Sequence, residues 1–517
     1  PEDMLGIHVI PLPDWVYENR EKMLGTAPSQ MNPILDADPT PPYEECFDKI
    51  VFRTSFEKSD QYMIMGGISH GYHAHPDGNS IIEMTDNGRY CIFDSGYFVP
   101  DTVEHNTLVV YRDGLFEPIQ RLTGLAAKAD FDDLGMTQTY LNGYNGVDWR
   151  RNVIWSKENY FLVIDEVQAA EPGNYGLNAI FRTLSDKKPE VAGDRLCAFH
   201  KGTAFNIVSA SQTPIGLTST TPPSANRYAV VEAKSSDMAV GDKQHFYNLL
   251  YTAPEQGAYP HEIVPAGDGA VMIKSPDGYA LAGTGECEPG PNMIVNAATF
   301  HVAPDAFHLA GGVTLTSTMT WFASDKPVNI GVNLADGTGM LEAKENCVVR
   351  LYAKGDEIKL DGKAVQTRTD DHAVEFDVPA GSHTLGFTPG AQSIALGEGW
   401  EQAWTQWQGT HQQALAGLTG GDGGGAQLQA AWKVDASRIE TKTVYVDAAG
   451  DEIEQIMSSG EDRRKRYGAA TRLENALAAM EKYGWTITRS LGYLKAMGSS
   501  GGRRPNNFFP DLLESTL

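Results

Sequence analysis

Several features that mark common protein classes are missing from this sequence. No run of about 18 apolar residues occurs, which is the length that a membrane-spanning helix requires. The five cysteines lie far apart without a CxxC spacing, so a thiolate zinc site is excluded and a disulfide framework is not expected. No nucleophile elbow, phosphate-binding loop or dinucleotide fingerprint is present. The glycine-rich run from 420 to 425 has the composition of a linker.

Positive charge is scarce. The chain carries 41 Lys and Arg against 67 Asp and Glu, a formal net charge of −26. This balance argues against nucleic acid or an anionic membrane as a partner. An acidic substrate would need a locally positive cleft, which net charge cannot reveal.

The remaining composition is typical of a globular protein rich in turns. Its 517 residues are 41% hydrophobic and 21% charged, with 53 Gly and 28 Pro. Strand patterns recur at roughly ten-residue spacing from Phe47 to about residue 320, with few helical patterns between them. We therefore expect a mainly β protein, with a large antiparallel β-sandwich followed by a smaller β-sandwich domain and a short, partly helical C-terminal segment.

The pattern divides the chain into four parts. Residues 1–45 form an entry segment or linker, and residues 46–325 form the large sandwich. Residues 326–395 form the small β domain, and residues 396–517 hold a Gly-rich linker and an unassigned α+β segment. The chain begins with Pro1 in mid-pattern and shows no signal peptide, so we interpret it as a processed or partial chain.

The stretch from His70 to Val110 concentrates the residue types that bind metals: HGYHAHPDGNSIIEMTDNGRYCIFDSGYFVPDTVEHNTLVV. Two apolar runs, Ser80 to Thr85 and Arg89 to Asp94, flank the tight-turn residues Asp86-Asn87-Gly88. This pattern predicts a β-hairpin. Folding about the turn places position 80 roughly opposite position 95. The end of the hairpin then lies beside the histidines that precede it: His70, His73 and His75.

We expect a third strand from Asn106 to Val110, with His105 directly before it. If it packs alongside the hairpin, His75, Asp94 and His105 come together. Two imidazoles and a carboxylate suit zinc, and no thiolates compete. The alternative is that each is an ordinary polar residue at a strand end. His73 and His75 share one face of an extended strand, so both could bind one ion, or one could bind while the other faces a substrate.

Two further side chains are candidates for binding substrate. Arg151 precedes an apolar strand, and an arginine aimed into a cleft can bind a carboxylate bidentately. Tyr144, in TYLNGYNG, could line a sugar cleft. The alternatives are a surface or ion-paired arginine and a tyrosine that packs in the core.

The combination GGISHGYHAHPDGNSIIEM, then FDSG, then EHNTLVV resembles the β-sandwich part of heparinase II/III-like polysaccharide lyases. The segment WRRNVIWSKENYFLVIDEV resembles a later strand pair of the same family, so the resemblance covers about residues 45–390. It implies cleavage of uronic-acid polysaccharides by β-elimination. Carried over to this chain, it makes His73 the catalytic histidine and His75, Asp94 and His105 the ligands of a Zn²⁺ ion that orders the active-site loop.

The resemblance also implies partners and a location. The expected partner is an acidic polysaccharide of the alginate or glycosaminoglycan type, and the expected location is periplasmic or secreted. A homo-oligomer is compatible with the sequence. The family's N-terminal helical toroid supplies a catalytic tyrosine and residues that contact the uronate carboxylate. With about 45 residues before the sandwich, we expect that toroid to be absent from this chain.

Two other functions remain compatible with the same residues. The chain could be a non-catalytic carbohydrate-binding or structural β-sandwich protein on the same scaffold. It could also be a zinc hydrolase, in which the metal activates a water molecule. Chelation of the metal distinguishes the hydrolase from the lyase, because it should stop a hydrolase at once and disable a lyase only slowly.

Overall fold

The computed structural model describes residues 4–14, 41–69, 75–94, 102–116, 119–219, 226–255, 259–276, 278–290, 292–355, 357–370, 373–396, 405, 445–446 and 452–453. The elements in these ranges are almost entirely β-strands, with two short 3-10 helices, η3 (Tyr43–Glu45) and η4 (Thr102–Glu104). The prediction of a mainly β protein is confirmed. Within the part of the chain that the structure describes, no helix has the length and hydropathy needed to cross a bilayer.

The first five strands form one antiparallel sheet, which we call the hairpin sheet. Its order is β1 (Gly6–Pro11), β2 (Phe47–Arg53), β3 (Tyr62–Gly66), β4 (Ser80–Asp86) and β5 (Arg89–Phe93). The predicted hairpin is confirmed as β4 and β5. Its turn places Asn87 at φ 50° and Gly88 at φ 72°, the left-handed pair that an Asn-Gly turn favours. The N-terminal segment contributes β1, so it is part of the sheet.

The hairpin sheet packs on an eight-stranded central sheet. Phe52 of β2 lies with its ring 5.9 Å from that of Trp155 and 5.9 Å from that of Phe161, both in the central sheet. Burial of large aromatic surfaces makes this contact a main source of cohesion. The central sheet has the order β13 (Glu190–Ala192), β14 (Arg195–His200), β15 (Thr203–Ser209), β18 (Lys243–Pro254), β11 (Tyr160–Ala169), β10 (Val147–Ser156), β9 (Leu134–Tyr144) and β8 (Gly124–Asp130).

A third sheet covers the same face of the central sheet. It contains β16 (Ile215–Ser219), β17 (Arg227–Met238), β12 (Gly173–Leu184), β6 (Leu108–Arg112) and β7 (Leu115–Phe116). We call it the companion sheet. Leu108, Tyr175 and Leu177 of this sheet share one buried cluster with Trp149 and Phe246 of the central sheet. The large antiparallel sandwich predicted from the sequence is therefore present, with two sheets on one side.

The strand that follows His105 lies elsewhere than predicted. The sequence predicts it at Asn106 to Val110, where it could pack beside the hairpin. It is β6 (Leu108–Arg112), and it pairs with β12 and β7 of the companion sheet. Asn106, just before β6, contacts the hairpin through Nδ2, which donates to the carbonyl oxygens of Ile81 (2.8 Å) and Phe93 (3.0 Å). His105 reaches the hairpin from a neighbouring sheet, across a sheet junction.

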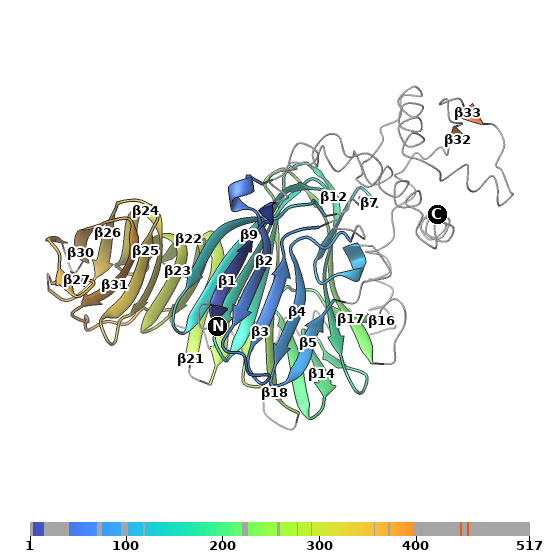
Figure 1. Cartoon of the computed structure of the whole chain (residues 1–517), viewed down its shortest axis with the longest axis horizontal. Helices are drawn as coiled ribbons and strands as arrows, with labels where there is room; N and C mark the ends of the chain where they lie inside the picture. Colours follow the sequence, from blue (N-terminus) through green and yellow to red (C-terminus); the bar gives the residue numbers. More distant parts are fainter. Residues whose placement is uncertain are drawn as a thin grey trace.

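The other face of the central sheet is also covered. Leu162 and Ile164 of β11 share a buried cluster with Val271, Ile273 and Ala282 of the last large sheet. Burial on both faces explains why β11 has the continuous apolar run FLVI without polar alternation. Figure 1 shows the hairpin sheet in blue at the centre and the gold strands of the last sheet extending to one end.

The last large sheet, the extended sheet, is continuous through the predicted boundary at residues 325 and 326. That boundary falls inside β24 (Thr320–Asn333), whose neighbours span both sides of it. One buried cluster runs from Val264 to Leu396. The other strands are β19 (Glu262–Pro265), β20 (Ala270–Ser275), β21 (Gly278–Gly290), β22 (Met293–Ala303), β23 (Ala306–Thr316), β25 (Thr338–Ala343), β26 (Cys347–Tyr352), β27 (Ile358–Leu360), β28 (Lys363–Ala364), β29 (Thr367–Asp370), β30 (Ala373–Val378) and β31 (Gly381–Phe387).

The predicted C-terminal segment, residues 396–517, lies almost entirely outside the described residues. Two short strands are described there, β32 (Tyr445–Val446) and β33 (Glu452–Ile453), and they pair with each other. The helical part of that prediction lies almost entirely outside the described residues.

Candidate metal centre

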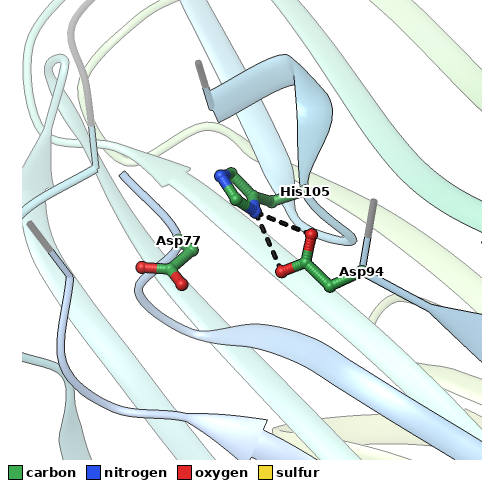
Figure 2. Close-up of side chains that lie close together, drawn as sticks. All are labelled: Asp77, Asp94 and His105. Atoms are coloured by element: carbon green, nitrogen blue, oxygen red, sulfur yellow. Dashed lines mark hydrogen bonds and ion pairs between the residues drawn. The ribbon is translucent and has the colours of Figure 1, made fainter. Parts of the chain in front are cut away.

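Three acidic or imidazole side chains meet where the hairpin sheet and the companion sheet adjoin (Figure 2). Asp77 lies in the loop before β4, Asp94 directly follows β5, and His105 lies between η4 and β6. Each offers a ligand atom, and these atoms all lie within 4.8 Å of one another. Residues separated in sequence thus form a compact group of two carboxylates and one imidazole.

The Asp77 loop is held by close backbone packing. At Gly78 a Cβ would lie 2.8 Å from Ile119 Cγ2 and 3.0 Å from the Gln120 carbonyl oxygen, so only glycine fits without a shift. Asn79 follows at φ 56°, a conformation that asparagine tolerates better than most residues. Together they turn the chain from the loop into β4 immediately after Asp77.

His105 is the most buried member of the group, at 1% exposure. Its Nδ1 lies 2.9 Å from Asp94 Oδ2 and 3.0 Å from Oδ1, as the dashed lines in Figure 2 show. Its Nε2 is buried and has no hydrogen-bond partner among the described residues. A buried polar atom left in this way costs free energy, so a partner that binds Nε2 would stabilise the site.

The charges in the group are unbalanced. Burial opposes the charged form of His105, but the hydrogen bond and charge of Asp94 and the charge of Asp77 raise its pKa overall. Burial, with the charge of Asp94 adding to it and that of His105 opposing, raises the pKa of Asp77 to about 6. Two carboxylates close together in a partly buried site repel each other, and a bound cation would offset that repulsion.

These features fit a divalent metal ion. Imidazole nitrogen and carboxylate oxygens without thiolates form a donor set that zinc accepts, although the same set also admits other divalent ions. His75 lies beside the group, with its ring 5.6 Å from that of His105 at an interplanar angle of 81°. The residues that would hold the metal are therefore Asp77, Asp94 and His105, with His75 adjacent.

A buried framework holds the backbone around His105. Arg182 of β12 donates from Nη1 to the carbonyl oxygen of His105 at 2.8 Å, and from Nη2 to Glu104 at 3.2 Å. The backbone N–H of Arg182 also donates to Asn106 Oδ1 at 2.6 Å. The candidate ligand His105 therefore lies on a segment that Arg182 of the companion sheet contacts at His105 and at both neighbouring residues, Glu104 and Asn106.

The predicted ligands are partly brought together. Asp94 and His105 are in contact, whereas the compact group contains Asp77 in place of His75. Sequence reasoning missed Asp77, although it lies two residues after His75 in HAHPDG, where one loop can present both side chains. The predicted catalytic residue, His73, lies outside the described residues, as does His70.

The structure does not support substrate contacts by Arg151 or Tyr144. Arg151 has 0% exposure and forms an ion pair with Asp165. Tyr144 has 1% exposure, its hydroxyl donates to the Leu108 carbonyl oxygen at 3.4 Å, and its ring lies 6.3 Å from that of Trp149. A sugar in solution reaches neither side chain in this conformation. The ion-paired and core-packed alternatives describe them correctly.

No family model and no curated protein sequence matches this chain. Among solved structures it is similar to heparan sulfate lyase HepC from Pedobacter heparinus, with 20% identity, a TM-score of 0.39, and coverage of 47% of this chain and 41% of that one. It is also similar to chondroitin AC lyase from Streptomyces coelicolor A3, with 11% identity, a TM-score of 0.36, and coverage of 66% and 49%. The chain thus spans less than half the length of either protein. Similarity at this level does not identify a function.

Proposed function

We propose that this chain is the β-sandwich part of a polysaccharide lyase that cleaves uronic-acid-containing polysaccharides by β-elimination. The observation that carries the proposal is the contact between Asp94 and His105, which come from FDSG and EHNTLVV, the pieces of sequence that resemble heparinase II/III-like lyases. His75 and Asp77, from the third piece, lie in the same place. A motif spread over three separate segments and gathered at one point is far more specific than any single piece.

The chemistry of β-elimination defines what the chain must supply. A base removes the proton at C5 of the uronate, and an acid protonates the oxygen that leaves C4. We assign the proton transfer on this chain to His73, the first histidine of HAH. Neutralisation of the uronate carboxylate, which makes the C5 proton acidic, needs donors or cations aimed at that group.

The metal centre of Asp77, Asp94 and His105 would act on His73 indirectly. A zinc ion bound there supplies fixed positive charge and a cross-link between the loop that carries His73 and the sheet junction. Asp94 contacts Nδ1 of His105, and Arg182 fixes the backbone at His105. His75 and Asp77 would hold the loop from the other side, which limits the positions that His73 can take.

The proposal extends to the partner and the location. The substrate is an acidic polysaccharide of the alginate or glycosaminoglycan type, and such polymers place the protein in the periplasm or outside the cell. With a net charge of −26 on the chain, binding of a polyanion depends on local cations and on screening by salt. We therefore expect activity to depend strongly on ionic strength.

The proposal is tested by incubating the full-length protein with alginate, heparan sulfate and hyaluronan and following the absorbance of unsaturated uronate. We expect elimination on one of these polymers, and a loss of about 10²–10⁴-fold in kcat for His73→Ala, which removes one general acid–base group. Zinc content should not change.

The matched control is His383→Ala, an exchange on β31 of the extended sheet, which should leave turnover unchanged. Absence of product from the wild-type protein on every polymer would contradict the proposal. Polymer binding without elimination would instead favour a carbohydrate-binding protein on the same scaffold.

A further inference from the structure

Beneath the candidate metal centre lies an ion pair with no exposure to solvent. Arg151 of β10 and Asp165 of β11 are directly opposite each other in the central sheet, and both side chains have 0% exposure. Arg151 Nε donates to Asp165 Oδ1 at 2.8 Å and Nη2 donates to Oδ2 at 3.0 Å. Trp149 Nε1 also donates to Asp165 Oδ1, at 2.9 Å. This two-point geometry fixes the plane of the guanidinium group.

The remaining arm of the guanidinium points to the two segments that carry the centre. Arg151 Nη1 donates to the carbonyl oxygen of Asn79 at 2.8 Å and to that of Asn106 at 3.1 Å. Asn79 lies two residues after Asp77, and Asn106 directly follows His105. One side chain of the central sheet therefore joins a loop of the hairpin sheet to the segment that enters the companion sheet.

Other contacts at this junction show that the connection is specific. Thr139 of β9, opposite Arg151, donates from Oγ1 to Asn79 Oδ1 at 2.6 Å, which holds Asn79 from the same side. The carbonyl oxygen of Asn106 also accepts from the backbone N–H of Ile81 at 3.1 Å. The two segments do not pair as strands, so Arg151, which donates to both, acts together with this backbone hydrogen bond to set the distance between them.

We infer that Arg151 and Asp165 form a positioning pair for the metal centre, with Asp165 fixing the guanidinium and Arg151 fixing the spacing between the Asp77 loop and the His105 segment. This inference rests on the metal site of the proposed function. Ligand geometry must be held closely for tight metal binding, and outer residues that orient ligands commonly change metal affinity by about 10–100-fold. Lysine cannot replace arginine here, because it lacks the planar fork that engages Asp165 and both carbonyl oxygens together.

The test compares zinc affinity in Arg151→Lys, Arg151→Met and Asp165→Asn with the wild-type protein, using competition against a chromophoric chelator. We expect affinity to fall by about tenfold or more in all three variants. The visible spectrum of the Co²⁺-substituted protein should also change in each variant, because it reports the coordination geometry, which a general loss of stability does not alter.

Two further variants keep the test informative. The double variant Arg151→Met with Asp165→Leu replaces the buried pair by apolar groups of similar size, a change that buried pairs often tolerate. It should fold and still bind zinc weakly, because the two carbonyl oxygens lose the donor that they share, Arg151 Nη1. Ile330→Ala, a cavity in the core of the extended sheet, should lower stability without altering zinc affinity or the Co²⁺ spectrum.

Wild-type zinc affinity and an unchanged Co²⁺ spectrum in the folded double variant would overturn the inference and leave the metal site standing. A wild-type protein that binds no divalent ion would overturn the inference together with the metal part of the proposed function.

Discussion

His105 is central to the candidate site because its two ring nitrogens are in different situations. Nδ1 contacts Asp94, and the buried Nε2 has no partner within the described ranges. The carboxylate of Asp77 interacts with His105 through its charge and offers a further ligand atom to the group. The most direct question at the scale of single residues is therefore whether Asp77 is a ligand.

Asp77→Asn removes a negative charge and keeps the size of the side chain. If Asp77 binds the metal, zinc affinity should fall by about tenfold or more, because a carboxylate ligand is replaced by a neutral amide. Isothermal titration with zinc measures the effect. The control Asp132→Asn changes an exposed carboxylate in the turn between β8 and β9 and should leave the affinity as it is. Equal affinity in the wild-type and Asp77→Asn proteins would remove Asp77 from the ligand set.

At the scale of elements, the β4–β5 hairpin is the part that local sequence specifies best. Its turn residues adopt the left-handed conformation that their identities favour, and its two strands end within one residue of the ends of the predicted apolar runs. A bulge between Met84 and Thr85 shifts the register by one residue, which the pattern of apolar positions did not reveal. Strand β6 lies in the companion sheet and not beside the hairpin, because its pairing with β12 depends on residues far away in the chain.

Gly88→Ala tests the turn. The glycine has φ 72°, and an added Cβ would meet only the Lys58 carbonyl oxygen at 3.9 Å, so the cost comes from the backbone conformation. We expect the free energy of unfolding to fall by about 1 kcal/mol, as measured by urea denaturation. The control is Gly386→Ala on β31, where φ is not positive and the nearest atom is 3.7 Å away, so stability should hardly change. An equal loss in both variants would contradict the assigned cause.

At the scale of the whole molecule, the central and extended sheets are joined by a buried histidine between two carboxylates. His245 of β18 lies with Nε2 3.2 Å from Glu166 Oε2 on β11 and with Nδ1 3.1 Å from Asp268 Oδ1, between β19 and β20. Burial opposes the charge on His245, but the two carboxylates raise its pKa above the ordinary value of 6.5. Burial opposes ionisation of Glu166. The hydrogen bond with His245 and the positive charges of Lys243 and Arg150 outweigh burial and lower the pKa of Glu166.

The sign of the pH dependence follows from the raised pKa of His245. Its contribution to stability is fully present below pH 6.5 and is lost as the pH rises through the higher pKa of the folded state. Each unit between the two pKa values corresponds to about 1.4 kcal/mol. Urea denaturation over this range should show the loss in the wild-type protein and a flatter profile in His245→Gln. A wild-type profile that rises across the same window would contradict the assignment.

Local sequence signals and long-range packing determine different parts of this fold and of its candidate site. Strand periodicity and turn residues are local, so the hairpin and the mainly β class could be predicted from the sequence. The expected closeness of Asp94 to His105 depended on a strand beside the hairpin, whereas His105 reaches Asp94 from the segment that enters the companion sheet. Arg151 shows the limit, because an arginine before an apolar strand is compatible with a cleft or with burial. Only the partner opposite it, Asp165, and the sheets stacked above decide between them.

The sequence by itself determined where the strands begin and turn, and which loop and strand ends carry the histidines and carboxylates, because these depend on neighbouring residues. The tertiary structure decided that β6 belongs to the companion sheet, that Asp77 joins Asp94 and His105, and that Arg151 lies beneath them. These outcomes depend on sheets packing across long separations in the chain. In that packing, every buried polar group must find its partner among residues that the local pattern does not specify.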